Sequence, residues 1–127
     1  MNWTATGAIA LALAVCIGAF GAHMLQGRLD AYSMNVYERA VMYHFFHALG
    51  LLIVAGLMAG GKLPQTGGAW ACGLLLAGIV LFSGSLYALA LTGQTILGAI
   101  TPFGGVSFIA AWIVLAVSAL RARPPLP

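Results

Sequence analysis

The chain has almost no charged residues. Only five of its 127 residues are Lys or Arg and two are Asp or Glu, and none of these lies among the 58 residues from Leu63 to Leu120. A soluble domain needs charged side chains to cover its surface, because Lys, Glu, Arg and Asp are almost never buried. The charge-free run is too long for one membrane crossing, which takes about 20 apolar residues, and it suffices for two. The sequence therefore predicts an integral membrane protein.

Two further patterns are missing, and each excludes a class of protein. The five basic residues form no stripe but stand at the borders of apolar runs, so we expect lipid phosphates and water, not nucleic acid, to be their partners. The apolar runs are continuous and number four, whereas a membrane barrel needs alternating residues in at least about eight strands. The lipid bilayer is thus the expected environment of helices, not strands.

The four apolar runs predict the fold class, an all-α membrane protein with four transmembrane helices in a compact antiparallel bundle. We expect a single domain over residues 1–127, with helices at about 4–25, 33–60, 69–92 and 102–120. Asp30 or Ser33 is a suitable N-cap for the second helix, and Pro102 suits the first turn of the fourth. The first run has no basic residue before it and exceeds the length of a signal-peptide core, so we interpret it as a retained helix.

The basic residues also predict an orientation. Four crossings place both termini on one side of the membrane, together with Lys62, Arg121 and Arg123, while Arg28 and Arg39 lie on the other. Positively charged loops favour the cytoplasm, so both termini are expected there.

Small residues recur along three of the predicted helices and indicate how they pack. Lipid supplies no hydrophobic drive between helices, so close backbone approach matters instead. The predicted packing positions are Ala10, Ala14, Gly18 and Ala22 in the first helix, Gly73, Ala77, Gly84 and Ala88 in the third, and Gly104, Ser107, Ala111 and Ser118 in the fourth. The alternative is that Ala and Gly are merely common in such helices. Self-association through these faces stays open.

The expected topology gathers most polar residues at one membrane face, where His23, Glu38, Tyr43 and His47 form a candidate polar site. His47 is expected about 10 Å inside the hydrocarbon, where an ionisable residue is a functional-site hypothesis by default. Tyr43 lies one turn before it. The alternative is a neutral His47 that bonds a serine hydroxyl or a carbonyl between helices.

The three histidines suggest three hypotheses about their role. His23, His44 and His47 are candidates for a three-histidine metal site, and His23 with His47 for haem ligation from two helices. No Cys-x-x-Cys-His or His-Glu-x-x-His motif supports either. Glu38 with His47 or His44 is a candidate for proton or solute movement, since Asp, Glu and His chains mark proton relays. A solvated interfacial pair of Glu38 and Arg39 is the alternative.

Several stretches together resemble the domain of unknown function 423 family, the YgdD-type small integral membrane proteins. The matching stretches are Gly18 to His23, Tyr43 with His47 to Leu49, Leu81 to Tyr87, and Thr101 to Val106 with Trp112 beyond. The resemblance implies several spanning helices, a bacterial inner membrane and no established activity. It also implies histidines at His23 and His47 and none at His44, which disfavours a three-histidine site.

No catalytic constellation is recognisable: Ser83, Ser85 and Tyr87 stand together without a Ser/His/Asp setting, so we predict no enzyme. The leading hypothesis is a binding or accessory protein that packs with itself as a homo-oligomer, with lipid or with a larger membrane complex. A small channel or transporter with a polar path near His23, His47 and Glu38 is the second hypothesis. A metal, haem or quinone-binding subunit is the third. The sequence does not specify a cofactor.

Overall fold

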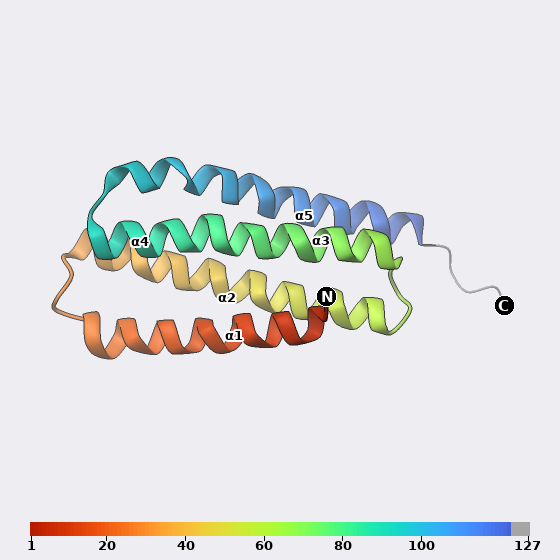
Figure 1. The fold of residues 1–127 in the computed structure, drawn as a ribbon, viewed down its shortest axis with the longest axis horizontal. Coiled ribbons are helices and arrows are strands. Elements are labelled where there is room, and N and C mark those ends of the chain that lie inside the picture. The colour runs from red at the N-terminus through yellow and green to blue at the C-terminus, as the bar shows by residue number, and fades with distance from the viewer. Residues whose placement is uncertain (123–127) are drawn as a thin grey trace.

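The computed structural model describes residues 1–122, which are helical apart from short loops (Figure 1). The elements are α1 Trp3–Phe20, extended by the π-helical turn η1 Gly21–Leu25; α2 Ala31–Ala59; α3 Gln65–Gly78, extended by the π-helical turn η2 Ile79–Ser83 and by α4 Gly84–Thr92; the 3-10 turn η3 Thr95–Ala99; and α5 Thr101–Arg121. They make four spans long and apolar enough to cross a membrane. The predicted all-α class with four transmembrane helices is confirmed.

The helix ends follow local sequence signals. The Asp30 carboxylate accepts a hydrogen bond from the Ser33 amide at 2.7 Å and so caps α2, as predicted. The third span begins at Gln65, four residues earlier than expected, and the Gln65 side chain donates to the Met58 carbonyl across the loop at 3.0 Å. Pro102 lies in the first turn of α5. The predicted orientation counts Arg123 among the basic residues of the terminal side. Arg123 and the proline-rich residues 124–127 lie outside the described residues.

The four spans lie in a row, and each runs antiparallel to the next along the chain (Figure 1). α2 packs against α1 on one side and against α3, η2 and α4 on the other, while α5 packs against α3 and η2. The spans that contain α1 and α5 therefore form the two edges of the row. At one end of the molecule the α1–α2 loop and the α4–α5 connection lie together.

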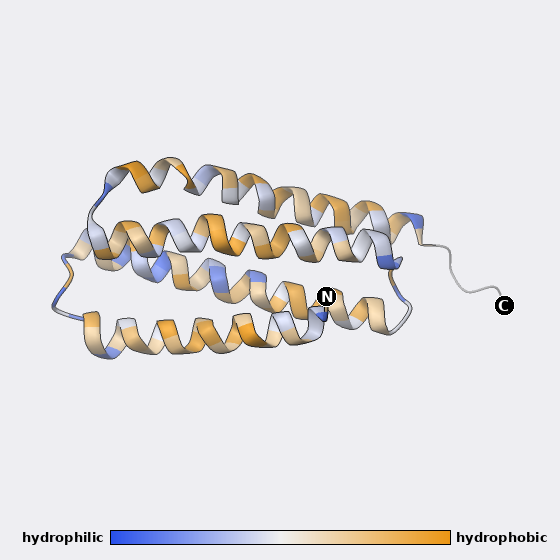
Figure 2. Ribbon diagram, viewed as in Figure 1, coloured by the Kyte–Doolittle hydropathy of each residue, from blue (hydrophilic) through white to orange (hydrophobic). Residues whose placement is uncertain are grey.

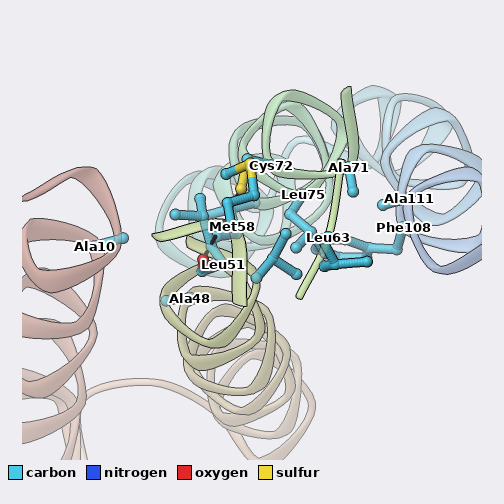
Figure 3. Close-up of a cluster of buried hydrophobic side chains, with 12 residues drawn as sticks. Ala10, Ala48, Leu51, Met58, Leu63, Ala71, Cys72, Leu75, Phe108 and Ala111 are labelled. Atoms are coloured by element: carbon cyan, nitrogen blue, oxygen red, sulfur yellow. Dashed lines mark hydrogen bonds between the residues drawn. The ribbon is translucent and has the colours of Figure 1, made fainter. Parts of the chain in front are cut away.

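The core lies where the spans meet, and the outside is apolar as well. Buried side chains from all four spans form the main cluster, including Ala10 of α1, Leu51 of α2, Leu75 of α3 and Phe108 of α5 (Figure 3). Hydrophobic residues colour most of the length of all four spans in Figure 2, and many of them are exposed, such as Phe103 at 70%. A soluble protein rarely exposes so much contiguous apolar surface, so these faces are the ones that contact lipid.

Most of the predicted small-residue positions named for the first and fourth spans lie at contacts between spans. Ala10 and Ala14 are buried, and Gly18 faces Val41 of α2. In α5, Ala111 is buried and Gly104 lies so close to η2 that an added Cβ would overlap the Phe82 backbone.

The third span packs through a different face from the one predicted. Gly73 has only Trp3 nearby at 3.9 Å, Ala77 is half-buried, and Gly84 has no atom of another helix within 4 Å. Instead Gly78 abuts the Phe108 ring, and Cys72 is fully buried. The third span lies between α2 and α5, so small residues on more than one of its faces contact a neighbour, and spacing alone did not identify which. Ala22 of η1 is exposed.

Candidate functional site

The only buried histidine of the described residues is the one that the family resemblance disfavoured. His44 of α2 is 4% exposed, and its Nδ1 lies 3.0 Å from the Tyr87 hydroxyl of α4. One partner donates and the other accepts, according to the histidine tautomer. The backbone of Ala10 on α1 lies next to the same ring. His44 therefore joins three spans in the interior of the protein.

Tyr37 extends this cluster toward the membrane face. Its ring lies 5.4 Å from that of Tyr87, centroid to centroid, and its hydroxyl donates to the Ile17 carbonyl of α1 at 2.6 Å. That carbonyl lies just before the π-helical turn η1. We call His44, Tyr87 and Tyr37 the buried cluster.

Serine hydroxyls make further polar contacts between spans. Ser83, at the end of η2, donates to the Ala40 carbonyl of α2 at 2.8 Å, and Ser85 lies 2.7 Å from the Thr101 hydroxyl at the start of α5. Ser107 of α5 donates to the Leu74 carbonyl at 2.7 Å. No buried side-chain nitrogen or oxygen in residues 1–122 lacks a partner. Each of these three serine hydroxyls thus bonds a neighbouring span.

His47 lies in an aromatic setting. Its ring stacks on Phe108 with centroids 3.5 Å apart, Trp112 lies 5.9 Å away, and the Tyr43 ring lies 5.8 Å from His47 and 6.3 Å from Phe108. Its Nδ1 lies 2.7 Å from the Tyr43 carbonyl one turn earlier in the same helix. His47 and Tyr43 therefore both face α5, and the bond between spans that sequence reasoning considered for His47 is made by His44.

His23 is remote from the other histidines. It is exposed in η1, two residues after Gly21, which abuts Tyr37 of α2. Because α1 and α2 run antiparallel, His23 and His47 are separated by roughly 18 Å along the helix axes, at about 1.5 Å per residue. This separation is too long for the candidate haem ligation by His23 and His47. No group of three His, Cys, Asp or Glu residues in the described chain could hold a metal ion, which also contradicts the three-histidine hypothesis.

Glu38 lies on the opposite side of α2 from His47. The two residues are nine positions apart, which is two and a half helical turns, so their side chains point in opposite directions. Tyr43 accompanies His47, and His23 stands apart on η1, so the four residues of the predicted polar site are not brought together. This geometry does not support the candidate cooperation of Glu38 with His47.

Glu38 instead borders a surface hollow between α1 and α2. The hollow has a volume of about 220 Å³, and its lining includes Gly18, Gly21 and Ala22 on one side and Tyr37, Glu38 and Val41 on the other. Gly18 of α1 and Gly21 and Ala22 of η1 leave room for it because they carry small side chains or none, and Gln26 and Met34 complete the lining. We call this hollow, together with its continuation below, the Glu38 groove.

The Glu38 groove continues down the outer face of α2. A second hollow of about 340 Å³ is lined by Glu38, Val41, Met42, Phe45, Phe46 and Leu49. Both hollows share Glu38 and Val41, so they form one continuous surface. The Glu38 carboxylate lies at the end nearest the start of α2, and apolar side chains follow from there to Leu49. Sequence reasoning named Glu38 but did not connect it with this apolar face.

Fold and interior geometry together define a small integral membrane protein of four spanning helices. The chain belongs to the family described as protein of unknown function (DUF423), whose family model matches residues 17–105. It is 52% identical over 116 residues to the UPF0382 membrane protein YwdK of Bacillus subtilis, covering 91% of this chain and 93% of that protein. It is 50% identical over 115 residues to the UPF0382 membrane protein SERP0230 of Staphylococcus epidermidis, covering 91% and 92%. No solved structure matches the chain.

The buried cluster had a detectable sequence signal. Tyr37, His44 and Leu51 follow one another at seven-residue intervals, with Ala40 and Ala48 between them, and all five are buried along one stripe of α2. Residues seven apart lie on nearly the same helix face. A polar residue in such a stripe indicates an interior position, and this stripe includes His44 but not His47.

Proposed function

We propose that this protein is a non-enzymatic binding or accessory protein of the membrane, which holds another membrane component against its outer surface. The observation that carries the proposal is the contrast between interior and surface. Polar side chains inside are engaged in bonds between spans, as in the buried cluster, whereas the Glu38 groove is a hollow on the outer surface with a carboxylate at its edge. A solute path would need polar groups that are free to exchange partners.

The proposal includes a location and an orientation. A bacterial plasma membrane, with both termini in the cytoplasm, agrees with the bacterial relatives and with the greater number of basic residues at the terminal side. In this orientation the Glu38 groove lies in the outer leaflet. Homo-oligomers and larger membrane complexes are partners that the exposed edges of the row permit.

The experiment compares permeation with binding. The full chain is reconstituted in vesicles loaded with a pH-sensitive dye, and proton and potassium fluxes are compared with those of protein-free vesicles. Native mass spectrometry of the gently extracted protein is run in parallel. We expect no flux above background and a reproducible additional mass. A pH-dependent flux that is lost in His44→Ala or His47→Ala would overturn the proposal in favour of a transporter.

A further inference from the structure

The Glu38 groove combines one carboxylate with a continuous apolar face, and Glu38 has no cation of its own. The neighbouring Arg39 guanidinium is directed to Asn35, with Nη2 and Oδ1 3.4 Å apart. The structure records no salt bridge to Glu38 within residues 1–122. A carboxylate at a membrane surface without an internal partner favours a ligand that carries a positive charge.

The depth of the groove agrees with the dimensions of a bilayer. Glu38 lies 21 residues before the end of α2 at Ala59, which is roughly 32 Å at 1.5 Å per residue, and the hydrocarbon core is about 30 Å thick. Glu38 therefore lies at the level of the lipid headgroups. From Glu38 to Leu49 the groove descends roughly 16 Å, about half of the hydrocarbon thickness. The groove thus extends through one leaflet.

Aromatic and aliphatic side chains shape the lower part for a chain-like occupant. Phe45 is 40% exposed, Phe46 is 65% exposed and Met42 is 47% exposed, and none of them is covered by another span. A methionine adapts to an irregular apolar partner, and the two aromatic rings offer large contact surfaces. The groove has a polar group at headgroup level and an apolar surface that extends through one leaflet. These two features match the headgroup and the acyl chain of a single membrane lipid.

We propose that the Glu38 groove binds one phospholipid whose headgroup carries a primary amine. The ammonium pairs with the Glu38 carboxylate and one acyl chain lies along Val41, Met42, Phe45 and Leu49. A primary ammonium has three N–H donors for the carboxylate, whereas a quaternary ammonium has none and a glycerol headgroup has no positive charge. The proposal rests on the proposed binding function and specifies its ligand class.

The test is native mass spectrometry of the full chain with equimolar phosphatidylethanolamine, phosphatidylcholine and phosphatidylglycerol of identical acyl chains. We expect the wild type to retain one phosphatidylethanolamine in preference to the other two. Glu38→Gln, which is isosteric and uncharged, should lower this preference about three- to fivefold, the size of a charge pair at a wet surface. Glu38→Asp, which keeps the charge, should retain most of it.

A second pair of variants tests the groove rather than the charge. Ala22→Phe places a ring in the hollow and should reduce retention of all three lipids, whereas Ala12→Phe, exposed on α1 outside the groove, should not. Equal retention of the three lipids by the wild type, or an unchanged preference in Glu38→Gln, would overturn the lipid assignment. Retention of a second copy or another protein in place of lipid would also overturn it, while leaving the proposed binding function intact. Solute flux in the vesicles described above would instead reject that function.

Discussion

The His44 imidazole of α2 and the Tyr87 hydroxyl of α4 lie 3.0 Å apart, and they connect two spans at a position where the His44 side chain is only 4% exposed. In hydrocarbon an unsatisfied polar group is costly, so such pairs hold helices in one arrangement. The Tyr37 ring beside Tyr87 and its bond to Ile17 extend the connection to α1. The buried cluster therefore fixes how three spans lie relative to one another.

Tyr87→Phe should destabilise the protein by about 1–3 kcal/mol, because it leaves a buried imidazole nitrogen without its partner. The free energy of unfolding can be measured by SDS titration followed by far-UV circular dichroism. Tyr32→Phe, at a tyrosine that is 67% exposed, serves as the control and should have little effect. In His44→Leu/Tyr87→Phe the loss should be smaller than the sum of the single losses. Equal stability of the two Tyr→Phe variants would contradict the role of this bond.

Gly104→Ala should separate α5 from η2, because the added Cβ overlaps the Phe82 backbone, which has no flexible end to move. Overpacking of this kind costs about 1–3 kcal/mol. The adjacent Gly105 is a matched control, since its added Cβ would meet only the Phe82 ring at 3.8 Å, an ordinary contact. Thermal denaturation in detergent should show a lower Tm for Gly104→Ala than for Gly105→Ala. A lower Tm for Gly105→Ala than for Gly104→Ala would show that α5 and η2 do not make their closest contact at Gly104.

Gly50→Ala should displace the Trp112 side chain, because an added Cβ lies 2.7 Å from the ring. Trp112 is a member of the aromatic setting around His47, so the variant should change the tryptophan emission spectrum. Gly56→Ala on the same helix has nothing within 4 Å of the added Cβ and should stabilise α2 by about 0.5–1 kcal/mol through helix propensity. If both variants left the spectrum unchanged, Trp112 would not pack over Gly50.

The Asp30 cap predicts a pH dependence at the start of α2. Hydrogen bonds from the Ser33 amide and hydroxyl, with a contribution from the Tyr32 amide, lower the pKa of Asp30 below its ordinary value of 3.8. A lowered folded-state pKa contributes stability that is present above 3.8 and is lost as the pH falls through the folded-state pKa. The protection factor of the Ser33 amide, which is its hydrogen-exchange rate corrected for the intrinsic rate, should therefore be lower at pH 2 than above the pKa of Asp30. Asp30→Ala should abolish this difference. A protection factor that changes neither with pH nor with Asp30→Ala would contradict the capping of α2 by Asp30.

Local sequence information was sufficient for the spans and insufficient for the third packing face. The absence of charge from Leu63 to Leu120 and the cap at Asp30 act within one helix, so they appear directly in the sequence. The choice of Gly78 over Gly73 depends on where Phe108 of α5 points. That direction depends on the packing of another span, which no local spacing contains.

By itself the sequence determined that this protein resides in a bilayer, that it crosses four times and that most polar residues gather at one end. Each of these follows from the cost of placing charge or unpaired backbone in hydrocarbon, which is a property of single segments. Only the tertiary structure decided that His44 rather than His47 bonds another span, and that Glu38 and His47 point away from each other. Those outcomes depend on the rotation of each helix about its axis, and this rotation is set by contacts with neighbouring spans.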